Sequence, residues 1–386
     1  MAGVAYAFVA TMIGTTLPTP LYPIYEQRFG ISGLTVTIIF ATYAVGVIAA
    51  LLLLGQRSDL IGRRPVLLLG LGFSAASAVV FLVAQGLPLL LVGRLLSGLS
   101  AGIFTGTATA ALVDLAPEEN KGLGTLVATA VNTGGLGLGP LLAGLLAQFA
   151  PDPLRLPYAV QLGLLLPGAW FVWQLAEPVK VRPGTGFGGL RIQRLHVPRE
   201  VRPIFIRAAS ASLAAFAVMG LFTAVAPSVL AELLGQPSHW LSGVVVFLVF
   251  ASSTLGQLAL EYVPARRALP LGCAVMVVGA GLIAGGIAAG SLVMLIAGGV
   301  IAGFGIGLSF RGGLSLVNSR SPAEHRGTVA SSYFVISYIA ISIPIVGIGV
   351  AAEATSLRPA GIVFSGLVGL LAAGTVVSLV RGEQRT

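Results

Sequence analysis

Charged side chains are scarce in this sequence. Of its 386 residues only 9% are Asp, Glu, Lys or Arg, whereas 56% are hydrophobic, and the mean hydropathy is +0.97. Soluble domains carry about 25% charged residues, so the composition excludes that class and indicates a surface that faces lipid. The apolar runs are long and continuous, unlike the short alternating strands of a transmembrane β-barrel. We therefore expect an all-α membrane protein.

Residues that ligate metals or act as nucleophiles are also few. The single cysteine, Cys273, has no second cysteine to pair with, and the three histidines fall in loops without metal-ligand spacing. No Ser/His/Asp arrangement is evident. The glycine-rich run at 184–189 is not a phosphate-binding loop, because no strand precedes it and no Gly-Lys-Ser/Thr follows it. The sequence predicts neither an enzyme nor a bound metal or cofactor.

Twelve apolar stretches are long enough to cross a bilayer, which takes about 20 residues. The first begins at residue 1 and lacks the basic start and the small-residue cleavage site of a signal peptide, so we expect it to be the first membrane span. An even number of spans places both termini on one side. The predicted spans are 2–24, 32–54, 65–86, 88–113, 121–149, 156–176, 204–232, 239–261, 267–288, 291–317, 327–352 and 358–380.

Basic residues are distributed unequally over the segments between the spans. With both termini in the cytoplasm, 17 of the 22 Lys and Arg residues lie in inner segments, and only Arg28, Arg155 and Arg358 lie in outer loops. Cytoplasmic loops of membrane proteins carry such an excess, which explains the net charge of +9 without a nucleic-acid partner. We predict a multi-pass protein of the cell membrane with cytoplasmic termini.

The sequence contains signs of an internal repeat. Gly98 and Gly102 recur 205 residues later as Gly303 and Gly307, followed in both copies by a proline and a further glycine. A register shared through a helix and its loop indicates duplication, which is a common plan in transporters. Between the copies lies an arginine-rich segment without an apolar span. We predict two pseudo-symmetric six-helix bundles and a cytoplasmic linker, with boundaries 1–176, 177–203 and 204–386.

A polar run, Gly55-Gln-Arg-Ser-Asp59-Leu-Ile-Gly62-Arg63-Arg64, separates the second and third spans. Its spacing resembles a signature of the major facilitator superfamily. The resemblance implies the fold of that superfamily and a part in conformational gating for these residues. At a helix end, Asp59 would hold Arg63 in a charge-assisted contact, and Gly55 would allow close helix packing. A basic turn without a further role is the alternative. The predicted gating residues in this run are Gly55, Asp59, Gly62, Arg63 and Arg64.

Three further motifs resemble those of the twelve-span drug:proton antiporters. Ile13-Gly14 with Pro20-Leu-Tyr-Pro23 resembles the first-helix motif, and the run from Leu90 through Arg94 to Gly102 resembles the fourth-helix arginine motif. The run Gly135-Leu-Gly-Leu-Gly139-Pro140 resembles the fifth-helix motif that marks exporters. A proline bends a helix because it removes a backbone hydrogen bond. We assign Gly135, Gly139 and Pro140 to gating, with ordinary small-residue packing as the alternative.

Arg94 lies within the fourth predicted span, where an arginine costs about 2.5–3.5 kcal/mol to insert. The resemblance implies a role in proton exchange, and an arginine bonded to backbone carbonyls is the alternative. No Asp or Glu lies clearly mid-span. The carboxylates that we consider for proton coupling are Glu26, which follows the Pro-Leu-Tyr-Pro segment, and Asp114, which could also pair with Lys121. The predicted coupling residues are Arg94, Glu26 and Asp114.

A substrate site would lie between the two halves. Asn132 is an amide in a span interior, where amides are rare, and Arg311 is a second arginine within a span, with snorkelling of its side chain as the alternative. Aromatic candidates are more often core or lipid-facing residues than ligand contacts. The predicted lining residues are Tyr22, Tyr43, Asn132, Phe216, Phe222, Arg311, Asn318, Tyr333 and Tyr338.

These features together predict a monomeric secondary transporter that exports small amphipathic or drug-like molecules. Its two halves would alternate access to the two sides of the membrane, with protons as the coupling ion and no cofactor. The missing mid-span carboxylate favours an alternative, a proton symporter or facilitator for a small metabolite. A non-transporting receptor or scaffold is less favoured, because only the linker offers room for a partner.

Overall fold

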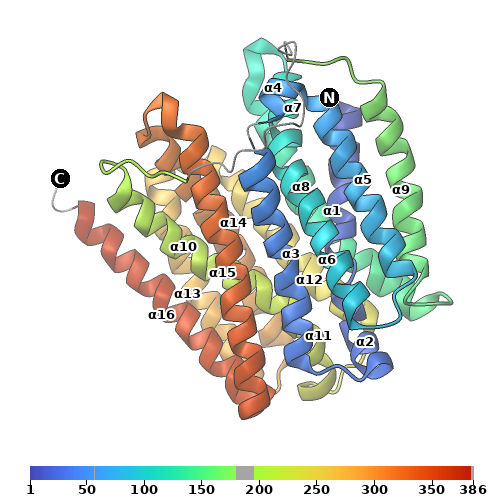
Figure 1. Ribbon diagram of the computed structural model, residues 1–386. Helices are drawn as coiled ribbons and strands as arrows, with labels where there is room; N and C mark the ends of the chain where they lie inside the picture. The colour runs from blue at the N-terminus through green and yellow to red at the C-terminus, as the bar shows by residue number, and fades with distance from the viewer. Residues whose placement is uncertain (56, 180–194, 384–386) are drawn as a thin grey trace. The chain divides into compact units, whose positions relative to one another are not determined.

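The computed structural model describes residues 1–55, 57–179 and 195–383, and these residues form helices, turns and loops without a strand (Figure 1). Twelve helices in this part of the chain are long and apolar enough to cross a membrane. The predicted all-α, twelve-span fold is therefore confirmed. The predicted boundaries 1–176, 177–203 and 204–386 stay a prediction, and residues 180–194 of the predicted linker lie outside the described residues.

The chain divides into two compact units, of which the first consists of Met1–Ile31 and Thr42–Arg194. In this unit α1 packs against α8 and α9, while α5 packs against α6 and α9. Its helical elements, with the part of α3 that belongs to the other unit included, are α1 (Ala2–Thr16), η1 (Thr19–Leu21), α2 (Tyr22–Phe29), α3 (Gly33–Leu54), α4 (Ser58–Ile61), α5 (Arg63–Leu82), α6 (Leu87–Ile103), η2 (Phe104–Ala108), α7 (Thr109–Asp114), η3 (Glu118–Asn120), α8 (Lys121–Phe149) and α9 (Leu156–Trp173).

The second unit consists of Ser32–Ala41 and Leu195–Thr386. Here α13 packs against α14 and α16, α12 packs against α14, and α10 packs against α14, α15 and α16. Its helical elements are α10 (Arg202–Gly220), η4 (Leu221–Val225), α11 (Ala226–Ser228), η5 (Val229–Leu233), α12 (His239–Leu258), η6 (Ala259–Glu261), α13 (Ala265–Ala289), α14 (Leu292–Arg320), η7 (Ala323–His325), α15 (Arg326–Ala354) and α16 (Leu357–Glu383).

Several predicted spans are interrupted within their length. The first span runs from Ala2 to Phe29 and is broken where the prolines near Thr16 remove backbone donors, so that a short 3₁₀ turn, η1, joins α1 to α2. Single π-helical turns occur at η2 between α6 and α7, and at η4 and η5 on either side of α11. Such turns widen a helix locally and occur often at functional sites.

The sequence repeat reappears as a repeat of helix packing. A Cβ atom placed on Gly98 would meet the carbonyl oxygen of Tyr43, so α6 and α3 approach backbone to backbone in the first unit. A Cβ atom placed on Gly303, the equivalent of Gly98, would meet the carbonyl oxygen of Val249, so α14 and α12 approach in the same way in the second unit. Small residues permit this close approach in lipid. The equivalent glycines therefore join the second and fourth spans of each six-span set.

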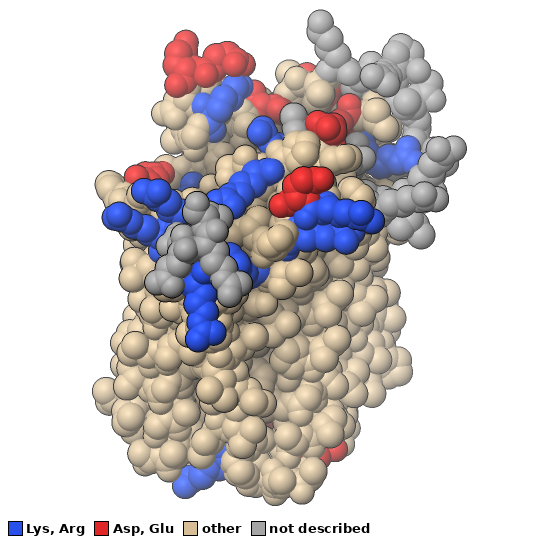
Figure 2. Space-filling view, turned by 90° about the vertical axis from the view of Figure 1, so that its left-hand side faces the viewer, with Lys and Arg blue, Asp and Glu red and all other residues tan. Residues whose placement is uncertain are grey.

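Charge is confined to part of the surface. On the face shown in Figure 2, Lys and Arg side chains gather toward one end, and the surface below them is almost entirely uncharged. Large apolar side chains are exposed, with Leu166 and Leu370 more than 70% accessible. Exposed apolar area of this extent marks an interaction surface. Together with the twelve apolar helices, it identifies hydrocarbon as the medium around the bundle.

Candidate functional site

Arg94 is the most deeply buried basic residue among those described, with 2% of its surface accessible. It lies on α6, and its Nη1 atom donates a hydrogen bond to the carbonyl oxygen of Thr15, 2.6 Å away. Its guanidinium carbon lies 4.7 Å from the centre of the Tyr43 ring. A buried charge is tolerated only where hydrogen bonds and favourable fields replace water. The interior of the first unit supplies both.

The acceptor for Arg94 arises from the way α1 ends. The last four carbonyl groups of a helix have no partner within it, and α1 ends at Thr16, just before Pro18. The Thr15 carbonyl belongs to this final turn, so it can accept from a side chain on another helix. The end of α1 before Pro18 thus creates the acceptor for the arginine of the fourth-helix motif.

More polar groups occupy the interior of the first unit. The Gln161 amide on α9 donates to the carbonyl oxygen of Ala10 at 2.8 Å, and the hydroxyl groups of Tyr25 and Tyr158 lie 2.9 Å apart. Four further atoms are buried without a hydrogen-bond partner among the described residues. They are Thr11 Oγ1, Tyr22 Oη, Ser97 Oγ and Gln161 Oε1. Unpaired buried polar groups are rare in proteins, so these atoms distinguish the interior of the first unit from an ordinary apolar core.

The predicted coupling residues do not form one cluster. Glu26 lies on α2, half-buried, within the first span, which extends past it as far as Phe29. Asp114 lies at the end of α7, 20 positions beyond Arg94 on the same span, which corresponds to about 30 Å along a helix. The structure therefore separates Asp114 from Arg94.

The run from Gly55 to Arg64 forms a network of ion pairs and hydrogen bonds. Arg63 is 7% accessible, and its guanidinium group contacts the Asp59 carboxylate at 2.6 Å, the Asp114 carboxylate at 3.0 Å and the Ser58 hydroxyl at 2.6 Å. Arg64 lies over the ring of Trp173, 5.1 Å from its centre. Arg63 thus ties α4 and α5 to the end of α7.

Glu177 completes this network from the other side. Its two carboxylate oxygens accept the backbone N–H groups of Arg63 and Arg64, at 2.7 Å and 3.1 Å. These are orphan donors of the first turn of α5, where a negative charge is also favoured by the helix dipole. Gly62 precedes the helix with φ of 103°, in the region that favours glycine, and a Cβ atom there would come within 2.5 Å of Glu177 Oε2.

Two details of this network correct the expectations from sequence. The carboxylate of Asp114 pairs with Arg63 and not with Lys121, because Lys121 forms an ion pair with Glu118 at 2.9 Å and donates to backbone carbonyls. Gly55 lies exposed in the turn after α3, so it does not serve as a close helix contact. The Gly-Asp-Gly spacing therefore positions the turn.

Helix α8 crosses α1 at the fifth-helix motif. A Cβ atom on Gly135 would lie 2.6 Å from Met12 Cβ, and one on Gly139 would collide with Thr16 Oγ1 and the carbonyl oxygen of Ile13. Pro140 has no N–H group and cannot bond to the carbonyl four residues earlier, that of Leu136. Thr16 replaces this bond, since its hydroxyl group donates to Leu136 at 2.8 Å.

Several predicted lining residues of the second unit are packing residues in this structure. Phe222 and Tyr333 are fully buried. The Phe222 ring packs against Gly299, and the Tyr333 hydroxyl lies 3.4 Å from the carbonyl oxygens of Ala208 and Phe310. These two side chains are enclosed by their own unit, and their assignment as lining residues stays a prediction.

The other predicted lining residues differ in accessibility and in their contacts. Phe216 and Tyr338 are half-buried, with ring centres 6.0 Å apart. Arg311 donates from Nη1 to the carbonyl oxygen of Gln257 at 2.7 Å, and Asn318 Oδ1 is buried without a hydrogen-bond partner among the described residues. In the first unit Asn132 on α8 is half-buried, whereas Tyr22 and Tyr43 are buried near Arg94.

Sequence reasoning missed Glu177, Thr16 and Ser58. All three bind groups on other elements, and two of them bind backbone atoms more than 110 positions away. Pro140 was the available signal for Thr16, because a proline in a span implies a free carbonyl four residues earlier. Within the described residues no group of three His, Cys, Asp or Glu side chains is placed to hold a metal ion.

The sequence profile of the Major Facilitator Superfamily matches residues 4–344. The quinolone resistance protein NorA of Staphylococcus aureus is 26% identical over 155 residues, which span 40% of this chain and 39% of NorA. An uncharacterized MFS-type transporter of Methanocaldococcus jannaschii, MJ1560, is 25% identical over 155 residues, 40% of each chain.

A solved structure shares the fold over nearly the whole chain. The human organic anion transporter MFSD10 (TETRAN) has a TM-score of 0.69 at 18% sequence identity, covering 97% of this chain and 98% of that structure. At this identity the likeness concerns the fold alone. Profile, spans and fold agree across the twelve helices. The chain therefore belongs to the major facilitator superfamily, whose members are multi-pass membrane transporters and not enzymes.

Proposed function

We propose that this transporter exports small amphipathic or drug-like molecules in exchange for protons. The observation that carries the proposal is the bond from Arg94 to the last turn of α1, next to the crossing of α1 with α8. A buried cation and a glycine-lined helix crossing therefore act on the same helix. A change in charge near Arg94 would shift α1, and α1 is the helix against which α8 slides.

Proton coupling in this proposal uses Arg94 and Glu26. Arg94 donates a hydrogen bond to the first span, and Glu26 is the carboxylate within that span. Proton and substrate would bind in competition, so that release of one favours binding of the other and the two exchange across the membrane. No cofactor is required. We propose that Asp114, which is held by Arg63, controls the conformation of the first unit instead of carrying the proton.

The substrate class is supported by the relatives. NorA is named for quinolone resistance, and the segment aligned with it covers 155 residues. The pairing of hydroxyl groups, amides and aromatic rings in the interior of the first unit suits amphipathic solutes, which need both hydrogen bonds and apolar contacts. We propose that the protein acts as a monomer in the cell membrane with both termini in the cytoplasm.

A second candidate function is a proton symporter or facilitator for a small metabolite. Among the described residues, the carboxylates of the spans lie near span ends, as Glu26 and Asp114 do, and this favours a transporter without a mid-membrane proton carrier. Substrate movement that is insensitive to a pH gradient would support a facilitator, whereas accumulation in vesicles with an alkaline interior would support a proton symporter.

Transport by reconstituted full-length protein tests the proposal. Vesicles with an acidic interior should accumulate amphipathic cations and quinolones above the level reached without a pH gradient. Arg94→Ala should lower this gradient-driven uptake at least tenfold, Arg94→Lys should retain part of it because the charge remains, and Glu26→Gln should abolish the response to the gradient. Arg155→Ala, which changes an exposed arginine, serves as the control. Equal final levels with and without the gradient would exclude proton antiport.

A further inference from the structure

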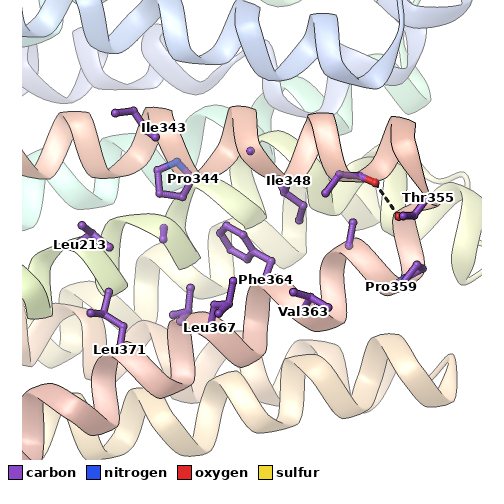
Figure 3. A pocket seen from close by; sticks show the side chains of 15 residues that line it. Leu213, Ile343, Pro344, Ile348, Thr355, Pro359, Val363, Phe364, Leu367 and Leu371 are labelled. Carbon is purple, nitrogen blue, oxygen red and sulfur yellow. Dashed lines mark hydrogen bonds between the residues drawn. The ribbon is translucent and has the colours of Figure 1, made fainter.

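A long apolar groove lies on the surface of the second unit, between α10, α15 and α16 (Figure 3). Its volume is about 600 Å³, and side chains such as Leu213, Ile348 and Phe364 point into it from the three helices. The only labelled polar side chain, Thr355, lies at one end and donates its hydroxyl proton to the Ala351 carbonyl at 2.7 Å. The groove has the volume of a ligand site but offers a ligand almost no polar group.

A second hollow of about 260 Å³ continues this groove along α10 and α16. The two share Leu371, and the second one ends among Arg207, Ser210 and Ser378. From Pro359 to Ser378 the helix rises by about 28 Å, close to the hydrocarbon thickness of a bilayer of about 30 Å. We call the two hollows together the α10–α16 groove. It runs from an apolar end to a basic end.

The basic end carries polar groups that have no partner in the described chain. Arg207 is half-buried, and no hydrogen bond or ion pair joins it to another described residue. The same holds for the exposed Ser378, and Arg381 follows in the last turn of α16. The five donors of a guanidinium group match the oxygens of a phosphate. Basic pockets between membrane helices bind phosphate-bearing headgroups in this way.

The groove is open because two of the residues that line it are glycines, which have no side chain. Gly347 on α15 and Gly374 on α16 line it, and a Cβ atom on either would meet no atom within 4 Å. The rim is formed by exposed apolar residues, among them Ile343, which is 69% accessible, and Leu370, which is 71% accessible. In a membrane these residues lie against acyl chains, and the groove extends that contact inward.

We propose that the α10–α16 groove binds an anionic phospholipid. Its phosphate contacts Arg207 and Ser378, and an acyl chain runs past Leu371 into the apolar part beside Phe364. A second copy of the chain fits less well. In a two-fold contact about an axis normal to the membrane, the arginines of both copies would stand at the same depth and repel each other.

Lipid binding to the purified, delipidated full-length protein tests this inference. Native mass spectrometry with dioleoyl phosphatidylglycerol and dioleoyl phosphatidylcholine should show preference for the anionic lipid. Arg207→Gln should weaken phosphatidylglycerol binding about tenfold and leave phosphatidylcholine binding unchanged. Arg202→Gln is the matched control, because Arg202 lies on the same helix, is exposed and bonds to the Val197 carbonyl. Equal loss in both variants would show a general charge effect and overturn the proposal.

A glycine pair tests the apolar part independently. Gly374→Leu fills the groove and should reduce bound lipid and remove the rise in melting temperature that phosphatidylglycerol gives the wild type. Gly366→Leu is the control, since Gly366 is also exposed on α16 with nothing within 4 Å but lies outside the groove. Unchanged lipid binding in Gly374→Leu contradicts the proposal. Loss of a cross-linked dimer in that variant, with lipid binding intact, would assign the groove to a second copy.

Discussion

Single side chains in this protein form hydrogen bonds with backbone groups that prolines and helix ends leave without a partner. Thr16 bonds to the Leu136 carbonyl freed by Pro140, Arg94 bonds to the last turn of α1, and Glu177 accepts two amides at the start of α5. In hydrocarbon an open backbone group costs several kcal/mol. Each of these side chains therefore fixes the relative position of two segments of the first unit.

Glu177 provides the prediction at the scale of the residue. Glu177→Gln removes the charge at the N-terminus of α5 and leaves one acceptor oxygen for two N–H groups. We expect a loss of about 1–2 kcal/mol at this helix end. Hydrogen exchange of the Arg63 and Arg64 amides, measured by mass spectrometry, should become about tenfold faster. Glu119→Gln changes an exposed carboxylate of the same unit and should leave exchange at α5 unaltered; equal acceleration there would contradict the cap.

At the same scale, the motifs identified Arg63, Asp59 and Arg94, because the residues of each motif lie close together in the sequence. Glu177 and Thr16 carry no such local pattern. Their partners are backbone atoms 114 and 120 positions away. A backbone carbonyl or amide has no sequence signature of its own, so contacts of this kind emerge only when the helices are placed.

At the scale of the element, positions of spans follow from hydropathy, and their internal breaks do not. The second predicted span, 32–54, matches α3, because a continuous apolar run of this length crosses a bilayer as a single helix. The first span was predicted to end at residue 24, but it continues to Phe29 through a 3₁₀ turn. The π-helical turn at η2 lies in an apolar run and leaves no mark on hydropathy.

The crossing of α1 and α8 gives the prediction at this scale. Gly139→Ala places a methyl group where Thr16 Oγ1 and the Ile13 carbonyl lie, so the helices must separate. Overpacking of this kind costs about 1–3 kcal/mol, and separation also breaks the bond from Thr16 to Leu136. We expect a lower melting temperature and at least a tenfold loss of transport rate in proteoliposomes.

Gly134→Ala is the control for this variant. It lies on the same helix, about one third of a turn around the helix axis from the crossing. A Cβ atom there would meet nothing within 4 Å, so this variant should behave as the wild type. Full transport by Gly139→Ala would show that the two helices need not stay in contact during the cycle.

At the scale of the whole molecule, the repeat of glycine contacts shows that each six-span set joins its second and fourth helices in the same way. The sequence foretold this from the offset of 205 between Gly98 and Gly303. The same offset places Gly299 at the position equivalent to Arg94, so the second set has no arginine there. What the sequence did not predict is that Arg94 is almost fully buried in the first unit.

The orientation of the chain is the prediction at this scale. Cysteines introduced at Glu119 and Arg266 should react with a membrane-impermeant maleimide only after cells are permeabilised, whereas those at Arg155 and Ser356 should react on intact cells. All four positions are exposed. The native Cys273 is buried and should contribute little background labelling. The opposite pattern would place the termini outside and reverse the direction of export.

The bond between Arg94 and Thr15 also bears on how the protein is made. Its partners are 79 positions apart, so the end of α1 leaves the ribosome well before the fourth span. When that span enters the membrane, its arginine meets an acceptor that is already in place. A chain that lacks the first span should therefore integrate its fourth span poorly at the translocon, because the guanidinium group would face lipid alone. In this way the first helix assists the membrane insertion of the fourth span during synthesis.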